Sequence, residues 1–227
     1  SNLRTAIITA LDQYAGNVEL NKFGGRFKYS KLSTLIDRID NGITSNITKV
    51  IIRRDLKALL NQFAQYELCF GNKFNINPAG FNIKSTGFTI SGFNDIAYIT
   101  DVPNKNASGN LDGSNMGTLS VVIKNNRGEQ RVVVKDAGVV DYMKGEVILN
   151  TINITSTVSN NNIIEVQAFP ESNDVVGLKD LYLSFDVSKS TINTIKDVIA
   201  SGEDVSGVVF QRDYYTSSYS NGDLERK

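Results

Sequence analysis

The apolar positions near the start of the chain recur every three to four residues, the spacing of one face of an α-helix. Asn2 can cap this first helix, and Gly16 can end it. A second amphipathic helix can begin at Ser30 and stop at Asn41 and Gly42. The predicted inward faces consist of Leu3, Ala6, Ile7, Ala10, Leu11 and Tyr14 in the first helix, and of Leu32, Leu35, Ile36 and Ile39 in the second.

Alternation of apolar and polar residues predicts strands elsewhere. Residues 18–23 and 47–56 flank the second helix as strands, and residues 74–180 show short alternating runs separated by Gly, Asn, Asp and Ser, a pattern typical of antiparallel sheet. Residues 104–117 are too polar to be buried and are predicted to form a loop. The clearest hairpin pairs Leu119, Val121 and Ile123 with Val132 and Val134 across a turn at residues 125–128, and further strands are expected at residues 139–142, 146–149 and 163–168.

The end of the chain repeats the pattern of the beginning. Residues 181–187 are predicted as a strand, Ser188 or Ser190 as the cap of a helix that Gly202 ends, and residues 208–214 as a second strand. Two strand–helix–strand units can combine into a split β-α-β sheet. We therefore predict an α+β fold of the ferredoxin-like kind with an inserted antiparallel β-rich module; two successive domains are the alternative. The N-terminal half would comprise residues 1–73, the insert residues 74–180, and the C-terminal half with its Tyr- and Ser-rich tail residues 181–227, whose helix would turn Ile192, Ile195 and Ile199 inward.

The composition restricts the chemistry that the chain can perform. It contains 24 Lys and Arg against 24 Asp and Glu, so no net field draws it to nucleic acid or to an anionic membrane. It has no histidine and a single cysteine, Cys69, so the usual general base is missing and a reducing cytoplasm is the expected folding environment. We predict no catalytic, metal-binding or cofactor-binding residues and no small-molecule substrate. No apolar run reaches the length of a membrane span, and the start at Ser1 leads us to expect a fragment of a longer protein.

Acidic pairs and one polar loop are the remaining candidates for chemistry. A solvated surface is favoured over a glycosidase-like pair, because the apolar stripe of the second helix leaves Asp37 and Asp40 on its polar side. The loop at residues 104–109 begins like a calcium loop, but Asn115 stands where a bidentate glutamate is required. The other acidic pairs are Asp136 with Asp141 and Glu203 with Asp204.

The C-terminal tail places Tyr214, Tyr215 and Tyr219 among serines. Tyrosine buries a large ring while keeping a polar tip, and it is enriched where proteins meet. These three residues are therefore predicted to form a docking element, and a simple extension of the preceding strand is the alternative.

Four stretches of the chain carry a family resemblance. Two begin within residues 23–72 and read YSKLSTLIDRIDNGITSNITKVIIRRDL and YELCFGNKFN; the others are AGVVDYMKGEVILNTI at residues 137–152 and NDVVGLKDLYLSFDV at residues 173–187. Together they resemble the baseplate wedge proteins of T4-like contractile-tailed phages, which are related to the baseplate J-like family. In that family a Val-Asp-Tyr element followed by Gly-Glu-Val-Ile-Leu forms a hairpin, and Asp141, Tyr142 and Gly145 hold those places here. The similarity extends over nearly the whole chain and points to the C-terminal part of the inner-baseplate wedge subunit.

The resemblance implies a late structural protein of the virion, located in the tail baseplate and assembled in the cytoplasm of the infected cell. The implied partners are other baseplate wedge proteins and the chain itself, as a homodimer that joins adjacent wedges around the central hub. Neither nucleic acid nor membrane is an expected partner. Two other interpretations stay open: a carbohydrate-binding or cell-wall-degrading tail protein, and an unrelated cytoplasmic scaffold.

Overall fold

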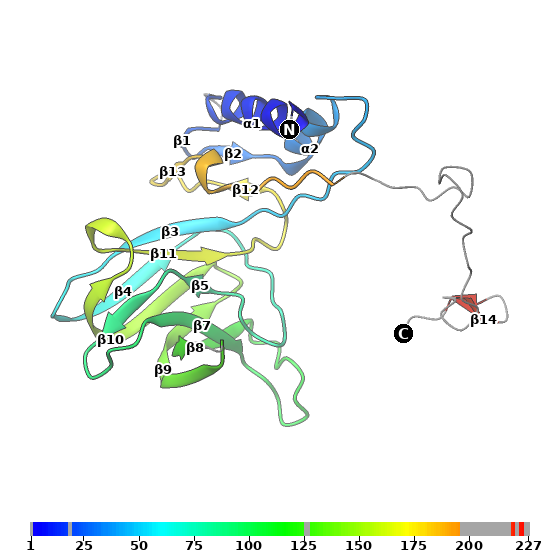
Figure 1. Ribbon diagram of the computed structural model, residues 1–227. Helices are drawn as coiled ribbons and strands as arrows, with labels where there is room; N and C mark the ends of the chain where they lie inside the picture. The colour runs from blue at the N-terminus through cyan, green and yellow to red at the C-terminus, as the bar shows by residue number, and fades with distance from the viewer. Residues whose placement is uncertain (1, 18–19, 125–127, 196–218, 221–222, 225–227) are drawn as a thin grey trace, which may run out of the picture. The chain divides into compact units, whose positions relative to one another are not determined.

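The computed structural model describes residues 2–17, 20–124, 128–195, 219–220 and 223–224, and it divides the chain into two compact units. The first unit, Ser1–Ile192, contains the helices and sheets described below (Figure 1). In the second unit, Asn193–Lys227, strands β14 (Tyr219–Ser220) and β15 (Asp223–Leu224) form an antiparallel pair.

Both predicted N-terminal helices are confirmed, as α1 (Asn2–Ala15) and α2 (Tyr29–Asp37). The start of α2 differs from the prediction, because Lys28 and not Ser30 occupies the N-cap position, and its side chain makes no capping hydrogen bond. The Tyr29 N–H donates instead to the Asp174 carboxylate at 2.8 Å, so a residue far along the chain supplies the missing acceptor. None of the described helices is long and apolar enough to cross a membrane.

Two pairs of short antiparallel strands accompany the helices. β1 (Lys22–Phe23) pairs with β13 (Tyr182–Leu183), and β2 (Arg26–Phe27) pairs with β12 (Val175–Val176). The Tyr14 ring of α1 meets the rings of Phe27 and Phe185 edge-on, with centroids 6.3 and 5.8 Å away. Aromatic packing thus joins α1 to segments from both ends of the first unit.

A three-stranded antiparallel sheet follows, in the order β3 (Ile52–Lys57), β11 (Ile163–Ala168), β5 (Lys84–Ser85). β3 confirms the strand predicted over residues 47–56, although its pairing begins only at Ile52. β11 lies between two neighbours, and its alternate residues Ile164, Val166 and Ala168 are almost completely buried.

Five antiparallel strands close into a barrel in the order β6, β7, β8, β9, β10, with β10 returning to β6, and β4 (Phe63–Cys69) adds to β10. β10 pairs with β9 through its first residues and with β6 through its last. Two irregularities accompany this change of neighbour: a register shift between Leu149 and Ile152 in the pairing with β4, and one between Ile154 and Ser156 in the pairing with β6. The bounds are β6 (Phe88–Ile90), β7 (Ala97–Pro103), β8 (Met116–Lys124), β9 (Gln130–Asp141) and β10 (Glu146–Thr157); the 3-10 turns are η1 (Asn160–Asn162) and η2 (Val187–Lys189).

Two predicted hairpins are confirmed within the barrel. Val121 pairs with Val134 across the β8–β9 hairpin, and Asp141 pairs with Glu146 across the β9–β10 hairpin. Gly145 turns the second hairpin with a φ of 71°, and a Cβ there would sit 2.1 Å from the carbonyl oxygen of Asn72. Glycine is therefore required at this position for both its conformation and its lack of a side chain.

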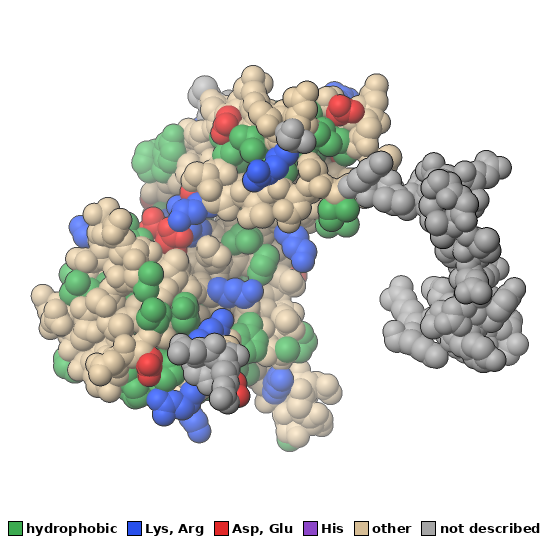
Figure 2. All heavy atoms as spheres, viewed as in Figure 1, with side chains coloured by type: hydrophobic (Ala, Val, Ile, Leu, Met, Phe, Trp, Pro, Cys, Tyr) green, Lys and Arg blue, Asp and Glu red, His purple; other side chains and the backbone are tan. Residues whose placement is uncertain are grey.

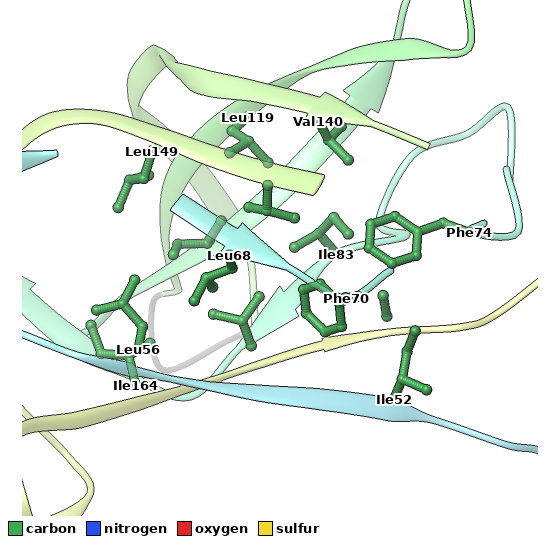
Figure 3. Close-up of a cluster of buried hydrophobic side chains, with 14 of the residues drawn as sticks. Ile52, Leu56, Leu68, Phe70, Phe74, Ile83, Leu119, Val140, Leu149 and Ile164 are labelled. Atoms are coloured by element: carbon green, nitrogen blue, oxygen red, sulfur yellow. The ribbon is translucent and has the colours of Figure 1, made fainter. Parts of the chain in front are cut away.

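The barrel and the three-stranded sheet share one hydrophobic core. Figure 3 shows Leu56 and Ile164 on one side of Leu68, with Leu119 and Leu149 of the barrel on the other. All these side chains are at most 7% exposed. The apolar faces of the two sheets thus bury each other.

The predicted ferredoxin-like α+β fold is wrong. The first unit is mostly β with a closed barrel, and α1 and α2 are the α-helices of its described residues. A split β-α-β sheet needs full-length strands beside the helices, but β1, β2, β12 and β13 have two residues each. β3 joins β11 instead, because its inward residues Ile52 and Leu56 pack in the core shared with the barrel. In the predicted C-terminal helix, residues 190–195 are not helical, and the rest lies outside the described residues, as does the strand predicted at residues 208–214.

Candidate functional site

The open edge of β3 is the candidate binding surface of the first unit. β3 is the outer strand of its sheet, with β11 as its neighbour. The carbonyl of Glu165 accepts the Thr86 N–H, and its N–H donates to the Thr86 hydroxyl, at 3.0 Å each. The register partner of Glu165, Asp55, therefore points its own N–H and C=O away from β11. By the same alternation, the backbone groups of Arg53 and Lys57 face the open edge.

Apolar side chains flank this edge, which we call the β3 edge and define as residues 51–59. Ile47, just before it, is 88% exposed, while Ile51 and Leu59 within it are each 51% exposed. Asp55 and Lys57 are also exposed and carry opposite charges. An unpaired strand edge with exposed apolar residues can add a strand from another chain. The alternation of residues 47–56 predicted the strand, but nothing local indicated that one side of it would stay open.

Ion pairs occupy one face of the same sheet. Arg53 lies 3.2 Å from Asp186, 3.3 Å from Asp55 and 3.7 Å from Glu165, and Lys189 lies 2.9 Å from Glu165. The hydroxyl of Ser188, which donates to Asp186, lowers the pKa of that carboxyl most, and the Lys189 N–H and Arg53 add to the effect. These contacts hold η2 against the sheet and leave the backbone edge of β3 uninvolved.

A buried polar cluster at one end of the barrel escaped the sequence analysis. Asp101 is 1% exposed; one carboxylate oxygen accepts the Ile83 N–H at 2.6 Å, and the other accepts the Asn82 amide at 2.8 Å and the Tyr142 hydroxyl at 2.5 Å. Burial, followed by the neighbouring Asp101, raises the pKa of Tyr142 well above its usual range. The one available signal was that Asp101 alternates with the apolar Ala97 and Ile99 on the inward side of β7. Since the groups of this cluster bond to one another, its role is structural.

The predicted acidic pairs do not form a reaction centre in the part of the chain that the structure describes. Asp37 and Asp40 are both exposed, as expected for a solvated helix face. Asp141 accepts the Lys144 N–H at 3.0 Å, within the β9–β10 turn, whereas Asp136 lines a separate hollow between β9 and β10. Glu203 and Asp204 lie outside the described residues. Figure 2 shows acidic and basic side chains interspersed over the visible face, in keeping with the balanced charge.

In the polar loop between β7 and β8, side-chain oxygens of Asn106 and Asp112 accept hydrogen bonds from the loop itself. Asn106 accepts the N–H groups of Ser108 and Asn110, and Asp112 accepts the N–H and the hydroxyl of Ser114. The Ser114 hydroxyl lowers the pKa of Asp112 through this contact. Across the described residues, no group of three or more His, Cys, Asp or Glu side chains is arranged to hold a metal ion.

Of the three predicted docking tyrosines, Tyr219 alone belongs to the described residues. Tyr214 and Tyr215 lie outside them, and Tyr219 belongs to β14, where it pairs with Leu224. Their role as an interface stays a prediction.

Comparison with known proteins finds a similarity in the N-terminal part of the chain. Residues 1–55 match the family described as baseplate structural protein gp6, C-terminal domain III. The match covers α1, β1, β2, α2 and the first residues of β3, and it leaves the barrel unassigned. No curated protein matches the chain. The family match supports a structural role in a phage baseplate.

Proposed function

We propose that this chain is a non-catalytic assembly module of a contractile-tail baseplate, which joins adjacent wedges around the central hub. It does so by forming a homodimer and by contacting other wedge proteins, and it assembles in the host cytoplasm. The family match of residues 1–55 supports the baseplate role. The observation that carries the self-association is the β3 edge, where the outward backbone groups of Arg53, Asp55 and Lys57 lie between the exposed side chains of Ile51 and Leu59.

A two-fold axis suits this edge. In antiparallel pairing centred on Leu56, Asp55 lies opposite the partner's Lys57, and Lys57 lies opposite the partner's Asp55. The backbone groups of both residues face outward and can form the ladder, since Glu165 leaves those of Asp55 unpaired toward β11. Opposite charges directly across an antiparallel pair contribute roughly 0.2–1 kcal/mol each, and like charges oppose pairing by a similar amount. The symmetry makes every such pair occur twice.

A charge exchange tests this arrangement by sedimentation equilibrium over a concentration series. We expect the wild-type chain to dimerise with rising concentration. The single variants Asp55→Lys and Lys57→Asp should each weaken the dimer by about tenfold, since two attractive pairs become repulsive. The double variant should dimerise more tightly than either single variant, because the opposite charges again lie across from each other, although it lacks the 3.3 Å ion pair of Asp55 with Arg53 of the same strand.

The neighbouring exposed residues Lys179 and Asp180 supply the matched control. Their charge reversals, single or double, should leave dimerisation unchanged, because they lie outside the β3 edge. A wild-type chain that stays monomeric at every concentration would refute self-association. Single and double variants of equal affinity would refute this edge as its site.

A further inference from the structure

A hollow of about 270 Å³ lies at the seam of the barrel, where β10 leaves β9 and joins β6. The β9 ladder stops where Leu149 pairs with Gly138, and the β6 ladder starts where Ile154 pairs with Ile90. Between these points the Asn150 amide donates to the Asp136 carbonyl at 3.2 Å. We call this space the seam hollow; the residues of its wall that matter here are Phe63, Ser91, Phe93, Asp136, Asn150 and Asn153.

Aromatic rings form the apolar part of the seam hollow. Phe63 is 75% exposed and lies directly across from Asn153 in the β4–β10 ladder, so both side chains project on the same face. Phe93 is half-buried and packs against the core. An exposed phenyl ring next to a hollow offers a flat apolar surface. A ligand that covers this surface removes it from water, which favours binding.

Carboxylate and amide side chains, each with two polar atoms, form the polar part of the seam hollow. Asp136 carries two acceptor oxygens, while Asn150 and Asn153 each carry an acceptor and a donor. The Asn153 side-chain oxygen is buried and has no hydrogen-bond partner among the described residues. A buried acceptor without a donor is unfavourable by about 1–3 kcal/mol. Less than 1 Å² of this atom is accessible, however, so a ligand in the seam hollow does not reach it.

The charge of the wall selects among polar ligands. Asp136 is its one carboxylate among the described lining residues, and Lys and Arg are absent from them, so an anionic group would be repelled. A cation would use Asp136 and the rings but leave the amide donors unmatched. A neutral ring with adjacent hydroxyls uses all three features, since each hydroxyl both donates and accepts and the C–H face covers the phenyl ring.

From this geometry we propose that the seam hollow binds one neutral sugar ring, with Phe63 covering its apolar face and Asp136 and Asn150 holding its hydroxyls. The volume is below the roughly 300–1,000 Å³ of clefts that enclose drug-sized ligands, which suits a single ring. Cleavage of the sugar is not part of the proposal, because glycoside hydrolysis uses two carboxyl groups and Asp141 does not line the hollow.

Saturation-transfer NMR on the 227-residue chain tests the proposal, with the methyl glycosides of glucose, galactose and N-acetylglucosamine as probes. We expect saturation of the ring protons of at least one glycoside at millimolar concentration. The Phe63→Ala and Asp136→Asn variants should each weaken that binding by about tenfold or more, because each removes a direct contact. Both side chains are exposed, and matching thermal unfolding curves would establish that the variants fold.

Phe81→Ala and Asp180→Asn are the matched controls, since both residues are exposed and lie outside the seam hollow. The proposal is overturned if no glycoside receives saturation, or if the two hollow variants bind like the controls. It is also overturned if only glucuronic acid or an acetyl-arginine amide binds. The Asp55→Lys variant should bind sugar normally, and Phe63→Ala should dimerise normally, so this test and that of the β3 edge fail independently.

Discussion

Asp101 illustrates how a single buried carboxylate ties distant parts of the chain together. Burial of a charge is costly unless hydrogen bonds compensate it, and Asp101 receives three of them. Two donors come from Asn82 and Ile83, which precede β5, and the third comes from Tyr142, in the turn between β9 and β10. The cluster therefore fixes both segments to β7 and closes one end of the barrel core.

Removal of the Tyr142 hydroxyl tests the strength of this link. The Tyr142→Phe variant keeps the ring but leaves the Asp101 carboxylate with two donors, so we expect the free energy of unfolding to fall by about 1.5–3 kcal/mol. Urea denaturation at neutral pH measures the change. Tyr98→Phe is the control, because that ring is only half-buried and its loss of a hydroxyl should cost less than about 0.5 kcal/mol. Equal losses in both variants would contradict the role of Tyr142.

The same variant carries a pH signature. Because burial and Asp101 raise the pKa of folded Tyr142, the unfolded chain releases this proton near the ordinary value of 10.0 while the folded chain retains it. The contribution of protonated Tyr142 to the free energy of unfolding is therefore complete below pH 10. It is lost as the pH rises above 10, by at most about 1.4 kcal/mol per pH unit. The stability gap between wild type and Tyr142→Phe should narrow between about pH 9 and pH 11. A constant gap would contradict this.

At the level of elements, local patterns predicted α1, α2 and the β8–β9 hairpin correctly, because the residues that specify each lie close together in the sequence, and the family resemblance implied the β9–β10 hairpin. The short pairs of β1 with β13 and of β2 with β12 left almost no pattern, since two residues cannot show an alternation. Barrel closure depends on two register shifts in β10, which the alternation of residues 146–149 did not reveal. The β3 edge could be predicted as a strand but not as an edge, because its neighbour β11 lies far along the chain.

The start of α2 depends on one such distant residue. Asp174→Ala removes the acceptor of the Tyr29 N–H and should lower the free energy of unfolding by about 1 kcal/mol, the usual value of an N-terminal cap. Asp174→Asn retains an acceptor oxygen, so its free energy of unfolding should fall by only a few tenths of a kcal/mol. Asp180→Ala should have no effect. Chemical denaturation followed by far-UV circular dichroism measures all three. If Asp174→Ala matches Asp180→Ala, the contact does not stabilise the helix.

At the scale of the whole molecule, the segment that matches the baseplate family is not self-contained. Each of its elements finds its partner later in the chain: β1 in β13, β2 in β12, β3 in β11, and the first turn of α2 in Asp174. The Tyr14 ring likewise packs on Phe185. Residues 2–55 therefore fold together with residues 163–187, and the barrel lies between these two segments in sequence.

A chain cut after Lys57 should consequently fail to fold, although it holds every residue of the family match. It would keep two helices of 14 and 9 residues, lengths that are marginal in water without tertiary packing, and it would lose the strands that cover them. We expect weak helical circular dichroism and no cooperative thermal transition, whereas a chain ending at Ile192 retains all these partners and should melt cooperatively. A sharp transition in the shorter chain would mean that the matched segment folds alone and that its contacts with β11, β12 and β13 are not required for folding.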